Sequence, residues 1–211
     1  MTFAFPMSLD VAGRRCVVVG GGPLAAAKAR ALVEAGAEVV VLAAEPTAAL
    51  PEGVRHVPRG YRPGDLAGAF VAVVSGEDDP DVEAAWQEAE RERVLLNVVD
   101  DVPHCHFAFP AVVRRGDLRV AISTGGKAPA LAARLRRALE AQLGDEYGRL
   151  VDLLGEVRSA ALPRSVPFEE WARRWQAAVA DHEALAALVA AGDVDTARDR
   201  IRASVTGEAA R

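Results

Sequence analysis

The chain has little cysteine, no long apolar run and no N-terminal segment that resembles a secretory signal. Each of these absences argues against one class of protein. Cys16 and Cys105 are the only cysteines among 211 residues, so a disulfide framework is not expected. Charged residues interrupt every longer apolar stretch, which leaves no segment long enough to span a membrane. Residues 1–15 lack the basic region and the sustained apolar segment of a secretory signal. These absences predict a reduced, cytoplasmic protein with no membrane association.

The chain also lacks an overall excess of positive charge. Its formal net charge of −5 argues against nonspecific nucleic-acid binding as the main role. Residues 111–140 are the exception, because they hold seven cations against two acids, a net charge of +5, which leaves −10 for the rest of the chain. This segment is either a solvated basic face or a site for a polyanion, since guanidinium groups suit carboxylates and phosphates.

Apolar strands alternate with helices along the first half of the chain. The predicted strands are residues 15–19, 38–43, 54–57, 70–75 and 94–99, and the predicted helices are residues 24–33 and 81–93. Strands that are apolar on both faces are typical of sheets that helices cover on both sides. The order therefore predicts an α/β fold, a Rossmann-type doubly wound parallel sheet with right-handed crossovers.

The pattern changes after Pro110. Two strand-like pieces, residues 111–113 and 118–123, predict a small sheet, and everything beyond it is helical in pattern. The predicted helices are residues 130–143, 146–160, 168–180, 182–190 and 194–203. We therefore expect three parts: an NAD-binding Rossmann-type domain over residues 1–110, a connecting sheet region over residues 111–145, and a helical C-terminal domain over residues 146–211.

A glycine-rich turn follows the first predicted strand. Its pattern is G-x-G-x-x-A, made by Gly20, Gly21, Gly22, Pro23, Leu24 and Ala25. In this pattern the first glycine allows a tight turn, the second lets the backbone approach a pyrophosphate, and the small last residue lets the helix pack closely on the strand. The start of the helix adds free N–H groups and a partial positive charge. We therefore expect residues 20–25 to bind a dinucleotide.

Two later loops are candidates for the rest of the cofactor site. Glu45 follows the second strand, and it either binds the ribose hydroxyls or is a solvated loop residue. No arginine follows it to receive a 2′-phosphate, which favours NAD over NADP. Ser75 and Gly76 close a later strand and are expected to border the cofactor. The acids that come next either border it too or cap the following helix through Asp79.

The stretch NVVDDVPHCHFAFP, residues 97–110, is compatible with a metal site, a catalytic carboxylate or a plain turn. His104 and His106 share one face of an extended segment while Cys105 points to the other, and the spacing matches no usual zinc pattern. No metal site is therefore expected. Asp100 lies just past a buried strand, at the edge where open parallel sheets bind ligands. It is either a general base or only a turn former.

The order of these motifs resembles one family along residues 8–140. The segments that carry the likeness are SLDVAGRRCVVVGGGPLAAAKARALVEAGAEVVV, VVSGEDDP, NVVDD with a following FAFPAVV, and RVAISTGGKAPALAARLRRALE. They resemble the precorrin-2 dehydrogenase/sirohydrochlorin ferrochelatase family of siroheme biosynthesis, whose module also forms the N-terminal part of multifunctional siroheme synthases. Residues 145–211 are similar only in being a helical tail.

The resemblance implies an NAD-dependent dehydrogenase that converts precorrin-2, an octacarboxylate tetrapyrrole, to sirohydrochlorin. Family members form homodimers through the region after the Rossmann domain, and some also insert ferrous iron into the product to give siroheme. The family's catalytic aspartate corresponds to Asp100, which would take the proton that accompanies hydride transfer. Its glycine loop and its serine- and glycine-rich turn correspond to Gly20, Gly21, Gly22, Ser123, Thr124, Gly125 and Gly126.

A substrate with many carboxylates needs a basic site, and the basic segment comes directly after Asp100. We expect that the substrate is bound, or the site rimmed, by some of the residues Arg114, Arg115, Arg119, Lys127 and Arg134. Lys127 departs from the family pattern at the start of the next helix, where the helix dipole disfavours a cation, so it either binds an anion or is a surface lysine. The alternative reading of the whole chain is a non-catalytic NAD-binding regulatory or redox-sensing module, which needs neither Asp100 nor the basic segment.

Overall fold

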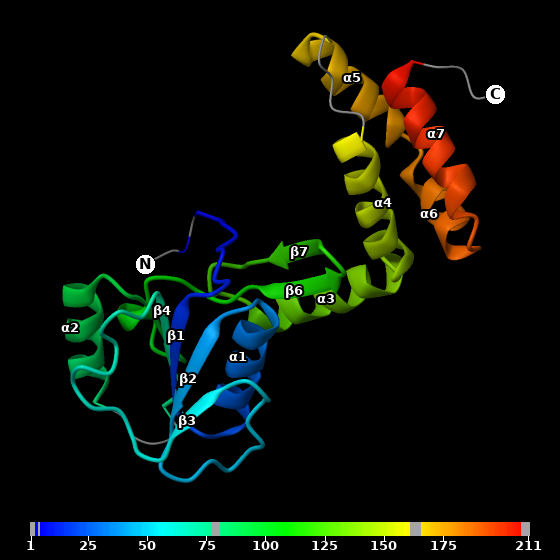
Figure 1. The fold of residues 1–211 in the computed structure, drawn as a ribbon. Helices are drawn as coiled ribbons and strands as arrows, with labels where there is room; N and C mark the ends of the chain where they lie inside the picture. The colour runs from blue at the N-terminus through cyan, green and yellow to red at the C-terminus, as the bar shows by residue number, and fades with distance from the viewer. Residues whose placement is uncertain (1–2, 4, 77–80, 161–165, 208–211) are drawn as a thin grey trace. The chain divides into compact units, whose positions relative to one another are not determined.

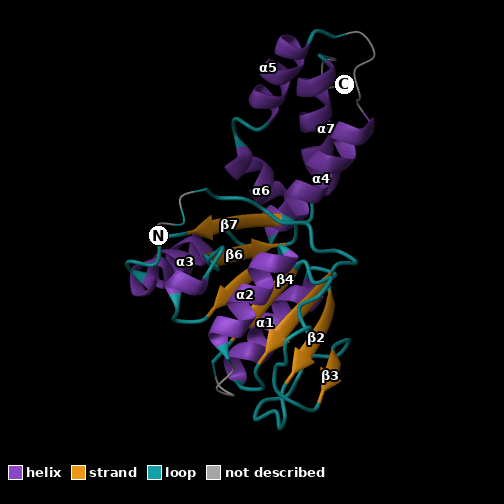
Figure 2. Ribbon diagram, turned by 90° about the vertical axis from the view of Figure 1, so that its left-hand side faces the viewer, coloured by secondary structure: helices purple, strands orange, loops and turns teal. Residues whose placement is uncertain are grey.

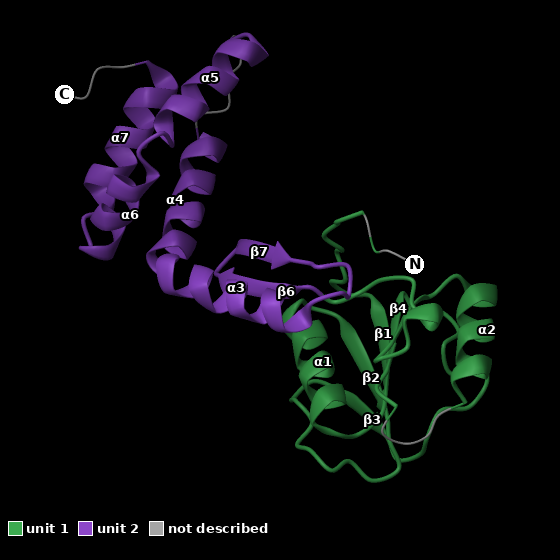
Figure 3. Ribbon diagram, turned by 180° about the vertical axis from the view of Figure 1, so that it is seen from behind, with its two compact units in different colours: residues 1–109 green, residues 110–211 purple. Residues whose placement is uncertain are grey.

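The computed structural model describes residues 3, 5–76, 81–160 and 166–207. The chain divides into two compact units, residues 1–109 and residues 110–211, which Figure 3 draws in different colours. Each unit has its own hydrophobic core. Of the described helices, none is both long and apolar enough to cross a membrane.

The first unit is built on a five-stranded parallel sheet (Figure 1). Its strands are β1 (Arg15–Val19), β2 (Glu38–Leu42), β3 (Arg55–Val57), β4 (Val71–Val74) and β5 (Leu95–Val98), in the spatial order β3-β2-β1-β4-β5. All four neighbouring pairs run parallel. The predicted doubly wound sheet is therefore confirmed.

Helices cover both faces of this sheet (Figure 1), and Figure 2 distinguishes its strands from the helices by colour. Side chains alternate along β1, so that Val18 packs with Ala25 and Ala29 of α1 (Pro23–Glu34) on one face. Val17, on the other face, packs in the core that contains Ala85 of α2 (Val82–Glu92). Burial on both faces explains why β1, β2, β4 and β5 are mostly aliphatic, whereas β3, at the edge of the sheet, is largely exposed. Asp81 caps α2 by accepting a hydrogen bond from the Ala84 N–H at 2.9 Å, whereas the predicted cap, Asp79, lies outside the described residues.

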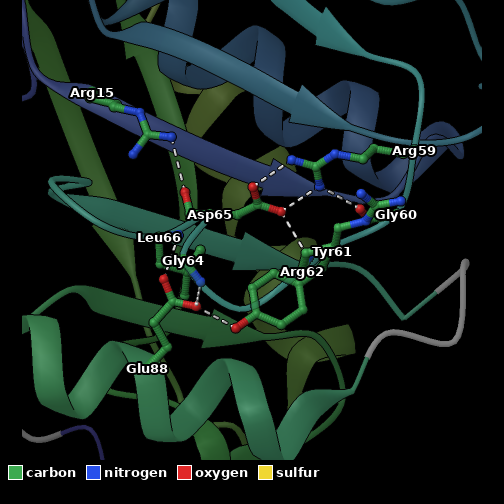
Figure 4. A network of polar contacts seen from close by, with 9 residues as sticks. All are labelled: Arg15, Arg59, Gly60, Tyr61, Arg62, Gly64, Asp65, Leu66 and Glu88. Atoms are coloured by element: carbon green, nitrogen blue, oxygen red, sulfur yellow. Dashed lines mark hydrogen bonds and ion pairs between the residues drawn. The ribbon is translucent and has the colours of Figure 1, made fainter.

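The long connection from β3 to β4 is held down by a buried carboxylate on α2 (Figure 4). Glu88 is 1% exposed, and it accepts hydrogen bonds from the Tyr61 hydroxyl at 2.5 Å, the Gly64 N–H at 2.9 Å and the Leu66 N–H at 2.8 Å. A buried charge is tolerated when several donors satisfy it. The network therefore fixes a connection that contains no helix or strand of its own.

An ion pair also stabilises the same connection (Figure 4). The guanidinium of Arg59 donates two hydrogen bonds of 2.7 Å to the two carboxylate oxygens of Asp65. This pairing lowers the pKa of Asp65 below its ordinary value. Arg15 of β1 donates to the carbonyls of Asp65 and Ala67, which ties the loop to the sheet.

The second unit joins a β-hairpin to a set of helices. The hairpin pairs β6 (Ala111–Arg115) with β7 (Leu118–Ile122) in antiparallel register, and the helices are α3 (Pro129–Gln142), α4 (Glu146–Ala160), α5 (Phe168–Ala178), α6 (His182–Ala190) and α7 (Val194–Thr206). The hairpin turn packs closely on α4, because a Cβ on Gly148 would lie 2.8 Å from the Arg115 backbone. Leu153 of α4, Val189 of α6 and Ile201 of α7 share the helical core.

Candidate dinucleotide and substrate site

The loops that carry the predicted site residues leave the sheet at one edge. Because all five strands are parallel, the residues that follow β2, β1, β4 and β5 come in that order along the carboxyl edge. The chain order reverses between β1 and β4, and this switch point is where open parallel sheets bind ligands. Two strand spacings, roughly 10 Å, separate the start of the glycine loop from the turn after β5.

The glycine loop after β1 leaves no room for side chains. Gly20 has a φ of 119°, and a Cβ there would lie 1.9 Å from the hydroxyl oxygen of Ser75. A Cβ on Gly21 would lie 2.8 Å from Cα of Pro46. These contacts explain why positions 20 and 21 are glycines. Without side chains, the backbone of the loop stays accessible at the edge of the sheet.

The N-terminus of α1 has the chemistry that a pyrophosphate requires. Gly22 is its N-cap and makes no side-chain capping bond, while Pro23 occupies the first helical turn. The first N–H groups of a helix have no partner within it, and they carry a partial positive charge. Ala25 is fully buried, which brings the helix start close to β1. The residues present therefore fit the pyrophosphate of a nicotinamide dinucleotide.

The loop after β2 folds back onto the glycine loop. The N–H groups of Thr47 and Ala48 both donate to the Gly21 carbonyl, at 3.0 and 3.1 Å. Glu45 lies in this loop and is exposed. The carboxylate is thus carried next to the predicted pyrophosphate site on the β2 side, which is the place that a ribose-binding acid requires.

Ser75 and Gly76 follow β4 but differ in what they can contact. Ser75 is buried, and its hydroxyl donates to the Val19 carbonyl at 3.1 Å, so it supports the glycine loop from beneath. Gly76 is exposed and has a φ of 78°. The acids at positions 77–79, predicted to border the cofactor or cap α2, lie outside the described residues.

Asp100 stands in the turn that follows β5. Its φ of 61° is in the left-handed region, which aspartate and asparagine tolerate better than other residues with a Cβ. It is exposed, and among the described residues it makes no hydrogen bond or ion pair. Strained backbone at a strand end is typical of functional turns. The structure therefore presents this carboxylate unpaired at the edge of the sheet.

The segment after this turn covers the open edge of β5. The N–H of Leu96 donates to Nδ1 of His106 at 3.0 Å, and the His106 N–H donates to the Leu96 carbonyl at 2.8 Å. The Val98 N–H donates to Sγ of Cys105 at 3.2 Å, and the thiol lies 3.1 Å from the Val98 carbonyl. Burial raises the pKa of this thiol and keeps it neutral. Unpaired edge strands invite aggregation, so this cover has a structural purpose.

The same contacts explain why the His-Cys-His sequence is not arranged as a metal site. His106 and Cys105 point their ligand atoms at the backbone of β5. Throughout the described part of the chain, no group of three or more His, Cys, Asp or Glu side chains could hold a metal ion.

Two arginines of the basic segment face each other across the hairpin. Arg114 of β6 and Arg119 of β7 are direct partners in the register, and both are exposed. Like charges in this position cost roughly 0.2–1 kcal/mol, which an anion between them would offset. Arg119 also donates to the Gly116 carbonyl at 2.6 Å within the hairpin, whereas the guanidinium of Arg115 donates to the Leu143 and Glu140 carbonyls at 2.6 and 2.8 Å. Arg115 closes the C-terminus of α3.

The turn between β7 and α3 is organised by its own side chains. Oγ of Ser123 accepts from the Gly125 N–H at 3.2 Å, and Oγ1 of Thr124 accepts from the Ala128 N–H at 3.1 Å. Gly125 and Gly126 both have left-handed φ angles. Lys127 is exposed just before α3 begins. The turn is therefore preformed, with a cation at its end.

Comparison with known proteins assigns this architecture. A family model described as "Putative NAD(P)-binding" matches residues 7–111, and one described as "Sirohaem biosynthesis protein central" matches residues 115–142. Siroheme synthase 1 of Pectobacterium atrosepticum is 36% identical over 209 residues, which cover 96% of this chain and 43% of that protein. The siroheme synthase of Azotobacter vinelandii is 42% identical over 168 residues, covering 77% and 36% respectively.

The chain belongs to the siroheme synthase family. It spans less than half the length of these curated relatives. SirC, a precorrin-2 dehydrogenase, has a similar solved structure with a TM-score of 0.70, covering 93% of this chain and 100% of that chain. At 23% identity this likeness shows the fold. The expected family and the expected Rossmann-type architecture are both confirmed, and the family assignment supports a nicotinamide dinucleotide as cofactor.

Proposed function

We propose that this chain is an NAD-dependent dehydrogenase that oxidises precorrin-2 to sirohydrochlorin in siroheme biosynthesis. The observation that carries the proposal is the unpaired carboxylate of Asp100, two strands along the carboxyl edge from a glycine loop that fits a dinucleotide. The names of the relatives, siroheme synthase and precorrin-2 dehydrogenase, supply the reaction and its substrate.

The oxidation removes a hydride and a proton from the macrocycle. When bound, the nicotinamide ring supplies the hydride acceptor. The backbone of Gly20, Gly21 and Gly22 and the start of α1 would hold the pyrophosphate of the bound cofactor. Asp100 accepts the proton on its carboxylate. A positioned general base of this kind contributes roughly 10² to 10⁴ in rate.

The remaining cofactor contacts follow from the loops at the same edge. Pro23, Leu24 and Ala25 form the helix start over which the phosphates lie, and Gly76 borders the cofactor beyond Ser75. Glu45 binds the ribose hydroxyls, and a carboxylate there repels a 2′-phosphate, so we assign NAD rather than NADP.

The carboxylates of the substrate require cations and N–H donors. We assign this role to Arg114, Arg119 and Lys127 together with the turn of Ser123, Thr124, Gly125 and Gly126. The opposite positions of Arg114 and Arg119 in the hairpin register and the preformed turn support this assignment. Arg115, whose donors are committed to the end of α3, acts by shaping the hairpin.

We further propose that residues 1–110 hold the cofactor, that residues 111–145 form a homodimer interface and bind substrate, and that residues 146–211 are a helical domain. Leu131 and Leu135 lie one turn apart on α3 and are 50% and 43% exposed, which supports a second copy of the chain as their partner. Cys16 and Cys105 are free and buried, in keeping with the reduced environment of the cytoplasm.

The decisive experiment is anaerobic conversion of precorrin-2 with NAD, followed by NADH absorbance and the macrocycle spectrum. Asp100→Asn is the sharpest variant, because asparagine tolerates the left-handed backbone and removes only the charge. We expect wild type to make sirohydrochlorin and Asp100→Asn to be slower by at least roughly 10². Ferrous iron added afterwards tests iron insertion separately, with the metal as a substrate. A wild type that binds NAD without turnover would instead support the regulatory-module reading.

A further inference from the structure

His104 lies between two carboxylates from different elements. Its Nδ1 is 2.7 Å from Oδ2 of Asp101, and its Nε2 is 3.4 Å from Oε2 of Glu83. The ring also meets Trp86 edge to face, with centroids 5.6 Å apart. The imidazole side chain is 27% exposed, so it is partly shielded from water. Both ring nitrogens therefore face acids, an arrangement that suits the doubly protonated imidazolium.

One of the two acids lies in the turn that carries Asp100, and the other lies at the start of α2. Asp101 follows Asp100 directly, in the turn between β5 and the short 3-10 helix Val102–His104. Glu83 is in the first turn of α2, the helix that follows the β4 loop at the cofactor edge. His104 thus links the turn that carries Asp100 to the helix that begins beside the cofactor loop.

The neighbouring His106 has a different role despite similar surroundings. It stacks on Trp86, with ring centroids 4.5 Å apart, and its Nε2 is 2.6 Å from Oε1 of Glu90. Its Nδ1 accepts the Leu96 N–H and so carries no proton of its own. Among the described residues, the charged groups that face His104 are therefore Asp101 and Glu83, whereas Glu90 is paired with His106.

We propose that His104 is a positioning residue, which holds Asp101 against α2 and, as an imidazolium, neutralises it so that Asp100 is the single free carboxylate of the turn. This role rests on the proposed dehydrogenase function. Two adjacent aspartates would otherwise compete for the same proton and repel each other, because like charges disfavour a second ionised group. Pairing one of them with His104 leaves the other as the unpaired carboxylate of the turn.

The pKa of His104 supports this assignment. The hydrogen bond to Asp101 raises the pKa of the ring above its ordinary value, and Glu83 adds to the effect. The imidazolium therefore persists to higher pH than in a free histidine.

The test compares His104→Gln, Glu83→Gln and Glu90→Gln in the dehydrogenase assay across pH. Glu83 and Glu90 both lie on α2, are 62% and 57% exposed, and each pairs with one histidine, so Glu90→Gln is a matched control. We expect kcat of wild type to fall as His104 loses its proton. His104→Gln should lose this step and have a kcat lower by about tenfold with KM for NAD unchanged. Glu83→Gln should move the step to lower pH, and Glu90→Gln should match wild type.

A pH profile of His104→Gln and Glu83→Gln that superimposes on wild type would overturn the proposal while leaving the proposed function intact. An inert wild type would overturn the proposed function itself and this role with it. The pairing of His104 with Asp101 and Glu83 can also be tested without the enzyme assay, because the chain has four histidines and their rings can be titrated by NMR. We expect Glu83→Gln to lower the pKa of His104 in this titration. An unchanged pKa would also refute the pairing of His104 with Glu83.

Discussion

The hydroxyl of Tyr61 donates a 2.5 Å hydrogen bond to the carboxylate of Glu88, and this contact joins the connection between β3 and β4 to α2 (Figure 4). Burial and the neighbouring Glu88 raise the pKa of Tyr61, so the phenol stays protonated and remains a donor. Glu88 has no access to water, and its three donors come from one loop. Glu88 is therefore the side chain that ties this loop to α2.

This arrangement predicts a large loss of stability when Glu88 is removed. Glu88→Ala leaves the Gly64 and Leu66 N–H groups without their acceptor, and the expected loss in the free energy of unfolding is about 3 kcal/mol. Tyr61→Phe removes one donor and should cost about 1–2 kcal/mol. Denaturant unfolding measures both. Glu92→Gln on the same helix is the control, since its surface ion pair with Arg91 should contribute less than about 0.5 kcal/mol, and equal losses for Glu88→Ala and this control would contradict the assignment.

Arg119 of β7 and Arg115 of β6 should have different roles: we expect the first to bind substrate and the second to be structural. Arg119→Gln removes a cation that faces Arg114, so we expect KM for precorrin-2 to rise about tenfold with the melting temperature unchanged or slightly higher. Arg115→Gln removes donors from the end of α3, so we expect a lower melting temperature. Steady-state kinetics measures the change in KM, and thermal unfolding measures the change in melting temperature. A raised KM for Arg115→Gln with a lowered melting temperature for Arg119→Gln would contradict this assignment.

Glu45 is predicted to set the choice between NAD and NADP. Glu45→Gln removes the charge that repels a 2′-phosphate, and the preference for NAD in kcat/KM should fall about tenfold, equivalent to about 1.4 kcal/mol. Glu52→Gln, a nearby exposed acid, is the control and should leave the preference unchanged. An unchanged ratio in Glu45→Gln would identify Glu45 as a solvated loop residue.

Much of the fold could be predicted because its signals are local. The β-branched run of β1, the glycine turn and the helix formers of α1 each depend on a few adjacent residues, and the bounds predicted for α4 and α6 match the structure. Strand ends were less well placed: the third strand begins at Arg55 and the fourth at Val71, one residue later than predicted in each case. Strand ends depend on the pairing partner, which local sequence does not contain.

The site was only partly predictable, because several contacts join residues that are distant in sequence. The sequence positions of His104 and Glu83 do not indicate that α2 contacts the turn after β5. The sequence also does not indicate that Cys105 binds the backbone of β5 at the edge of the sheet. Arg115 was grouped with the substrate-binding arginines by charge alone, whereas its neighbours commit it to α3. One signal was present for Glu88, an acid on the apolar face of α2 beside Ala85 and Ala89.

The raised pKa of His104 predicts a pH-dependent contribution to stability. Asp101 holds this pKa above its ordinary value of 6.5, so the folded chain binds the proton more tightly than the unfolded chain. The contribution is fully present below the unfolded pKa and is lost as pH rises through the folded pKa. The melting temperature of wild type should therefore exceed that of His104→Gln by more near pH 5.5 than near pH 9. Glu83→Gln should reduce this pH dependence because it removes one of the acids that favour the imidazolium. A difference between wild type and His104→Gln that is the same at both pH values would show that the ring is held by packing against Trp86 and that its charge contributes nothing.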